Sequence, residues 1–164
     1  MRISSAAYHE AGHAVVAVLL GMHVAAVSIK AKGFPPIRHL HGGVIASFDH
    51  RARQNRNKAE KAATAGLAGE QAEQLWCEQK PWRHAKSPRH PSLSGDRAYV
   101  EEMLGPVIED YKDKHRTIRR LKEVARTLRE SHWSCVEVLA TRLAKRKALS
   151  GAEVKRLVAS KNKD

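Results

Sequence analysis

The sequence predicts a mainly α-helical domain with a small β-sheet, in the α+β class. Hydrophobic residues make up 42% of the chain but aromatic residues only 5%, so Ala, Val, Leu and Ile must build the core, which favours packed helices. Only two short segments, 23–30 and 41–48, carry the branched residues typical of strands. A chain of 164 residues fits a single domain covering 1–164.

The first predicted helix spans residues 4–20. Ser4 and Ser5 offer N-caps, and the apolar run 14–20 continues the helix. Gly21 follows as a typical C-terminal stop. The apolar run predicts that this helix is buried.

The helix contains a His-Glu-x-x-His motif at residues 9–13. Residues four apart share one face of a helix, so His9 and His13 can bind one metal ion, with zinc expected. Glu10 lies beside them and is the candidate general base for a metal-activated water. A chance match among ten histidines is the alternative, but a buried histidine pair without partners would be costly. Gly12 weakens the helix by about 1 kcal/mol relative to Ala, which indicates close approach of another backbone.

The middle of the chain is predicted to contain the sheet and two more helices. The two strand segments would form a small sheet beside the metal helix. Residues 51–78 predict a long helix with a face of small residues suited to close packing, followed by a basic, proline-bearing loop at 79–93. A helix capped by Ser94 then places Asp96 in its first turn, where the helix dipole favours a carboxylate.

After Gly105 the chain is predicted to be helical to its end. Two apolar stripes and a capping box formed by Ser150 and Glu153 indicate three amphipathic helices. The domain is thus expected to divide into a metal-site core at 1–104 and a helical scaffold at 105–160.

The charge, the apolar runs and the cysteines narrow the expected partners and the expected location of the protein. The net charge is +13, but the basic residues lack interleaved aromatics and match no zinc-finger, RNP or cold-shock pattern, so nucleic acid is not an expected partner. The longest apolar run, Ala14–Leu20, is too short for a membrane span, which needs about 20 residues, and no signal peptide is recognised. The distant Cys77 and Cys135 form no metal-type pair and fit a cytoplasmic protein.

Several blocks of the chain together resemble the peptidase domain of the FtsH-type zinc proteases, whose peptidase is fused to an AAA+ ATPase. The specific block is the HEAGHAVV sequence, and the others support it through their order and spacing over nearly the whole chain. One of these, the helix block L-x-G-R-x-A-E of the family, has Glu70 in place of Arg. The similar segments are 9–16, 23–33, 42–45, 67–73 and 139–157.

The resemblance implies a third metal ligand and a substrate-binding strand. By position the third ligand is Asp96, which would give the three protein ligands and one water of a catalytic zinc. The local sequence departs from the family's T-G-A-x-N-D, so His84, His90 and Glu73 remain alternative ligands. In such peptidases an edge strand pairs with the extended substrate backbone, which implies that role for Gly42, Gly43, Val44 and Ile45. An ordinary hairpin strand is the alternative for this segment.

The resemblance implies a zinc-dependent endopeptidase that cleaves unfolded or extended polypeptides. The chain contains no Walker A motif, so it is expected to act without ATP, either alone or with a separate ATPase or adaptor. Because the family's peptidase domains assemble as rings, a homo-oligomer is also expected. The alternative is a zinc-stabilised, non-proteolytic adaptor whose basic surface binds an acidic protein or nucleic acid.

Overall fold

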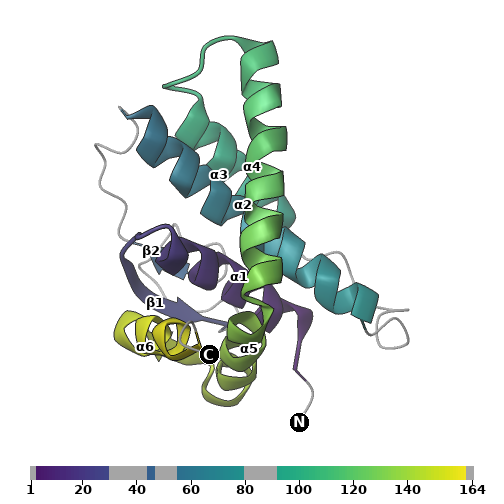
Figure 1. Ribbon diagram of the computed structural model, residues 1–164, viewed down its shortest axis with the longest axis vertical. Coiled ribbons are helices and arrows are strands. Elements are labelled where there is room, and N and C mark those ends of the chain that lie inside the picture. Colours follow the sequence, from purple (N-terminus) through teal and green to yellow (C-terminus); the bar gives the residue numbers. More distant parts are fainter. Residues whose placement is uncertain (1–2, 30–43, 47–54, 80–91, 162–164) are drawn as a thin grey trace.

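The computed structural model describes residues 3–29, 44–46, 55–79 and 92–161. They form a mainly helical fold with a small antiparallel sheet, as predicted (Figure 1). No helix within these ranges has both the length and the apolar character needed to cross a membrane. In chain order the elements are α1 (Ser5–Leu19), β1 (Val24–Ser28), β2 (Val44–Ala46), α2 (Arg56–Gln79), α3 (Ser92–Leu104), α4 (Tyr111–Ser131), α5 (Trp133–Arg146), β3 (Ala148–Ser150) and α6 (Gly151–Lys161).

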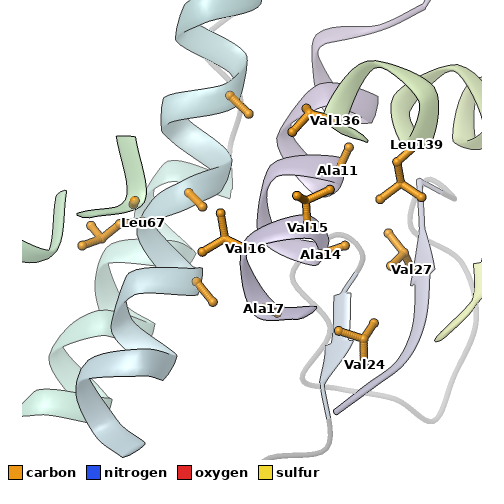
Figure 2. Close-up of a cluster of buried hydrophobic side chains, with 14 of the residues drawn as sticks. Ala11, Ala14, Val15, Val16, Ala17, Val24, Val27, Leu67, Val136 and Leu139 are labelled. Carbon is orange, nitrogen blue, oxygen red and sulfur yellow. The ribbon is translucent and has the colours of Figure 1, made fainter. Parts of the chain in front are cut away.

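Helix α1 lies at the centre of the fold. It contacts α2 on one side, and α5, α6 and the sheet on the other (Figure 1). Figure 2 shows the division: Val16 points towards α2, whereas Val15 lies near Val136 of α5. The predicted ends are close to those found, because Ser4 is the N-cap residue in extended conformation and Gly21 follows the helix with φ +74°. The Ser4 side chain makes no capping hydrogen bond.

The packing of α1 on α2 depends on the absence of side chains. A Cβ added to Gly12 would lie 2.6 Å from both the carbonyl oxygen of Ala68 and the Cβ of Ala72. This confirms the predicted close approach of another backbone at Gly12. The small residues of α2 are buried, as predicted for a packing helix, and Gly66 among them approaches α3 rather than α1. They are Ala59, Ala62, Ala63, Ala65, Gly66, Ala68, Gly69 and Ala72.

The sheet has the strand order β2–β1–β3, with both pairings antiparallel. Val24 and Val27 of β1 are both buried although they are three residues apart, and alternation would put them on opposite faces. The pairing register with β2 shifts between Val24 and Ala26, and such a bulge resets the alternation. Both valines can therefore face the core.

Two predictions for local structure are wrong. Residues 148–150 form β3 rather than continuing a helix, because Lys147 adopts the left-handed conformation (φ 66°), ends α5 and turns the chain towards β1. Helix α3 begins at Ser92 rather than after Ser94, so Ser94 lies within the helix instead of before it. Asp96 consequently lies in the second turn, where the helix dipole explains its presence less well.

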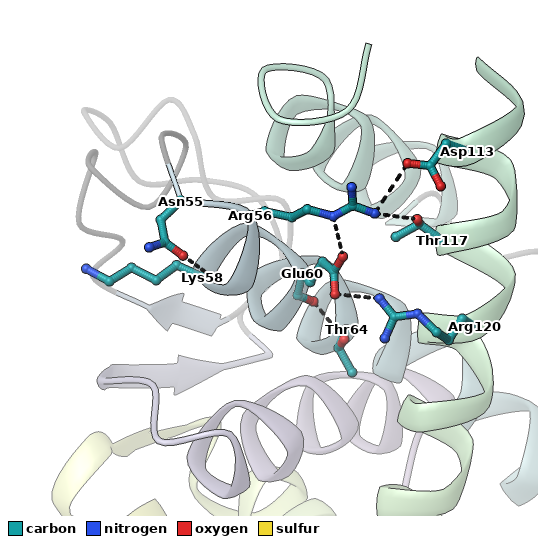
Figure 3. Close-up of polar contacts among 8 residues, drawn as sticks. All are labelled: Asn55, Arg56, Lys58, Glu60, Thr64, Asp113, Thr117 and Arg120. Carbon is teal, nitrogen blue, oxygen red and sulfur yellow. Dashed lines mark hydrogen bonds and ion pairs between the residues drawn. The ribbon is translucent and has the colours of Figure 1, made fainter. Parts of the chain in front are cut away.

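Polar contacts join α2 to α4 (Figure 3). Arg56 donates to Glu60 on its own helix and to Asp113 of α4 at 3.3 Å, and Arg120 of α4 pairs with Glu60. Asn55 caps α2 by accepting a hydrogen bond from the backbone N–H of Lys58 at 3.1 Å. Exposed ion pairs contribute little energy individually, so this network mainly fixes how α4 lies along α2.

Candidate metal centre

The two motif histidines lie on the side of α1 that faces α2 and α3. His9 is fully buried, and its neighbour Glu10 is 3% exposed. His13 follows one turn later with its ring nearly perpendicular to that of His9, the ring centroids being 4.7 Å apart. The predicted convergence of the two imidazoles is therefore confirmed.

Asp96 of α3 completes a cluster of three side chains. Its Oδ2 atom lies 2.9 Å from Nε2 of His9 and 3.5 Å from Nε2 of His13, and the two Nε2 atoms are 3.0 Å apart. Ligands at 2.0–2.1 Å from a tetrahedral zinc are separated from one another by about 3.3 Å. The observed spacings bracket that value, so the three atoms could hold a single metal ion.

The other nitrogen of each imidazole is held by the protein. Nδ1 of His13 donates a hydrogen bond to the carbonyl oxygen of Ala65 at 2.7 Å. Nδ1 of His9 lies 3.3 Å from a carboxylate oxygen of Glu73. A proton on Nδ1 leaves the lone pair on Nε2, so these contacts turn both lone pairs towards the centre of the cluster.

The electrostatics of the cluster favour a cation. Although burial lowers the pKa of His9, the carboxylates of Asp96 and Glu73 raise it to about 10. Burial alone would raise the pKa of Asp96, but the imidazoles of His13 and His9 bring this pKa well below its ordinary value. Among the described residues Oδ2 of Asp96, although buried, has no hydrogen-bond partner of good geometry. The cluster thus takes up positive charge, either a proton on His9 or a shared metal ion.

Glu10 is buried next to the cluster and titrates abnormally. Burial raises its pKa to about 9, and the charges of Asp96 and Glu73 add to the effect while His9 opposes it. A divalent cation held by His9 would lower this pKa and return Glu10 to the ionised form that a general base requires. Ionisation of Glu10 at neutral pH would therefore depend on a bound metal ion.

A space in α2 accommodates the ring of His13. A Cβ added to Gly69 would lie 2.3 Å from Nε2 and 2.5 Å from Cε1 of His13. No side chain other than that of glycine fits this position with the ring in place. Gly66 and Gly69 predict a tight helix approach in this segment, and Gly69 confirms it. That the group approaching Gly69 is the His13 ring, and that His13 donates to the Ala65 carbonyl, is not predicted from the sequence.

The remaining predicted site residues have different outcomes. Of the alternative ligands, Glu73 contacts the outer nitrogen of His9 rather than joining the cluster. His84 and His90 lie outside the described residues. The substrate-strand candidates divide similarly, because residues 42–43 lie outside the described ranges whereas 44–45 belong to β2.

Comparisons with known proteins identify no family for this chain, so a function must be argued from the geometry of the cluster. No protein-family model matches the chain, and no curated protein matches it significantly.

Proposed function

We propose that the chain is a zinc-dependent endopeptidase that hydrolyses unfolded or extended polypeptides. The observation that carries this proposal is the convergence of His9, His13 and Asp96 with a buried glutamate next to the first ligand. Two imidazoles and one carboxylate form a donor set that zinc accepts readily. Three protein ligands leave a fourth position for water or substrate, as a catalytic site requires.

Two of the three side chains of the cluster are partly exposed to solvent. The side chains of His13 and Asp96 are 12% and 18% exposed, whereas that of His9 is fully enclosed. The open position would therefore lie on the His13 and Asp96 side. When bound, zinc would lower the pKa of a water molecule and polarise the scissile carbonyl.

Glu10 handles the protons in this mechanism. Its carboxylate removes a proton from the attacking water and then delivers it to the nitrogen of the leaving amine. Burial strengthens this role, because a carboxylate shielded from bulk water keeps the proton within the site. The outer contacts of His9 and His13 hold the two imidazoles in the tautomer that the metal needs.

Strand β2 is the proposed site of substrate pairing. It is an edge strand that contacts α1, and on its side away from β1 no strand of the described part of the chain pairs with it. An extended polypeptide added there would form main-chain hydrogen bonds, which are permissive about sequence. A disordered substrate would need no unfolding step, which fits action without ATP.

The proposal is tested by measuring cleavage of casein and of a quenched fluorescent peptide by the purified, zinc-loaded protein. We expect cleavage that is lost with a chelator and restored by zinc. The Glu10→Gln variant should keep its zinc and lose at least 100-fold in rate, since general base catalysis contributes about 10²–10⁴. A matched control is Gln74→Ala on the exposed side of α2, which should keep full activity.

Two outcomes would reject the endopeptidase. Undiminished cleavage by Glu10→Gln would remove the assigned base. Stoichiometric zinc binding without turnover of either substrate would instead favour the non-proteolytic adaptor.

A further inference from the structure

Four cations form a row along the outward face of α4. Lys112, Arg116, Arg119 and Lys122 are spaced four, three and three residues apart, which places them on one side of the helix. The first three are exposed and Lys122 is partly exposed. The opposite side of the helix is buried against the rest of the fold, through Thr117, Leu121 and Ala125.

These four cations differ from the other basic residues of α4. Lys114 pairs with Glu101, Arg120 with Glu60 and Arg126 with Glu130, and Arg129 donates to the carbonyl oxygen of Gln71. Figure 3 shows Arg120 turned towards α2 for this reason. No carboxylate of the described residues lies within ion-pair distance of the four cations in the row. Their charge is therefore available to a partner.

An exposed aromatic pair stands at the N-terminal end of the row. Tyr111 is 68% exposed, the largest exposure of any large hydrophobic residue in the described ranges. Its ring contacts that of His115 at a centroid distance of 4.4 Å. His115 lies one turn before Arg119, so the flat rings adjoin the cations on the same flank of the helix.

We propose that this face of α4, comprising Tyr111, Lys112, His115, Arg116, Arg119 and Lys122, binds nucleic acid through its phosphate backbone. The four cations extend over about 15 Å of helix, roughly the length of four phosphates along one strand of a duplex. Guanidinium groups match phosphate geometry, and an exposed aromatic ring offers a stacking platform for a base.

Other anionic partners fit this face less well. Insertion into a lipid surface needs an apolar helix face, and that of α4 is already used in the core. An acidic polypeptide would satisfy the cations but gives no role to the exposed rings. Nucleic acid is not an expected partner from the sequence, which shows no interleaved aromatics and no known nucleic-acid-binding pattern. The fold places the exposed ring of Tyr111 beside four cations that have no ion-pair partner among the described residues.

The proposal is tested by fluorescence anisotropy with labelled 20-nucleotide single strands and 20-base-pair duplexes over 25–300 mM salt. Replacing all four cations by Gln should weaken binding at least ten-fold at low salt. The matched control replaces Arg142, Lys145, Lys155 and Arg156 of α5 and α6 by Gln; it has the same net charge and should bind within about two-fold of the original protein.

The salt dependence and one aromatic substitution give independent readouts. If each cation contacts one phosphate, log K should fall with log salt at a slope of about −3.6 for duplex and about −2.8 for single strands. Tyr111→Ala should weaken single-strand binding about five-fold or more, the lower range for base–aromatic stacking.

Three results would overturn the assignment. Equal losses in the two quadruple variants would show that net charge alone binds the probe. Competition by polyglutamate at equal charge concentration would favour an acidic polypeptide. Unchanged single-strand binding by Tyr111→Ala would remove the stacking platform, which is the feature that distinguishes nucleic acid from an acidic polypeptide at this face. Because α4 supplies no member of the metal cluster, failure here is separate from failure of the peptidase proposal.

Discussion

Each imidazole of the metal cluster presents one nitrogen to the centre and the other to the protein. The outer partners differ: His13 donates to a backbone carbonyl, whereas His9 contacts the carboxylate of Glu73. A carbonyl fixes a tautomer, but a carboxylate also makes the imidazole a stronger electron donor. Two residues outside the cluster, Glu73 and Gly69, would therefore decide how well a metal ion is bound.

Glu73→Gln should lower zinc affinity by about 10–100-fold without abolishing it. The amide oxygen can still accept from Nδ1 of His9, but the negative charge that supports the ligand is lost. A competition titration against a fluorescent chelator measures the change, with His9→Ala as the reference for loss of a true ligand. A loss as complete as that of His9→Ala would make Glu73 a ligand itself.

Gly69→Ala should reduce zinc affinity at least 100-fold while leaving most of the helical content intact. The new methyl group would stand 2.3 Å from Nε2 of His13, so the ring must move by about 1 Å, whereas ligand distances tolerate about 0.2 Å. The same titration, with circular dichroism to monitor folding, checks the result. Full zinc affinity in this variant would show that His13 is not held where the cluster needs it.

At the scale of the elements, short local devices begin and end the helices. The predicted capping box before α6 is present: the Ser150 N–H and hydroxyl both donate to Glu153, and the Ser150 hydroxyl accepts from the Glu153 N–H at 3.4 Å. Since β3 ends where α6 begins, this box also turns the chain from the sheet into the last helix.

Ser150→Ala should destabilise the protein by about 1 kcal/mol, because it removes a side-chain cap. For a chain of this size that corresponds to a fall in melting temperature of roughly 2–4 °C. Ser160→Ala, an exposed serine at the other end of α6, is the control and should change the melting temperature far less. Equal effects of the two substitutions would contradict the capping role.

The same box makes part of the stability depend on pH. The N–H and hydroxyl of Ser150, together with Arg146, lower the pKa of Glu153 from 4.5 to about 2. A depressed pKa stabilises the fold fully above pH 4.5 and ceases to do so as pH falls through about 2. The loss of stability caused by Glu153→Gln, measured by urea unfolding, should therefore be largest above pH 4.5 and shrink steadily below it.

The elements that the sequence predicts well have a local cause. Helix α1, the packing face of α2 and the capping box follow from apolar periodicity, small residues and caps within a few positions. Strand β3 does not, because three residues are too few for a strand pattern and its pairing with β1 depends on contacts more than 100 residues apart in the chain. The start of α3 is equally hard to predict, since the sequence suggests Ser94 as a cap whereas the helix begins two residues earlier, at Ser92.

The residues of the metal cluster also differ in how well the sequence predicts them. His9 and His13 follow from helical spacing alone. Asp96 is 83 residues beyond His13, so no spacing rule reaches it, and the resemblance to a family supplied its position. The Ala65 carbonyl carries no sequence signal at all, because every residue has one.

At the scale of the whole molecule, the metal cluster joins separate parts of the fold. Its ligands come from α1 and α3, and its outer contacts come from α2. Helix α1 in turn is the element on which α2, α5 and the sheet pack. An ion bound there would cross-link the centre of the core to a helix that follows it by more than 70 residues.

Zinc should therefore raise the melting temperature whether or not the protein is a peptidase. Binding to the folded state alone at 100 times the dissociation constant contributes about 2.7 kcal/mol, or roughly 5–10 °C for a chain of this size. Differential scanning calorimetry with zinc and with a chelator measures the difference. Asp96→Asn should reduce the shift strongly, and Glu10→Gln should retain it, because Glu10 is assigned to the proton and not to the metal. A shift that survives in Asp96→Asn would place the metal elsewhere in the chain and remove α3 from the site.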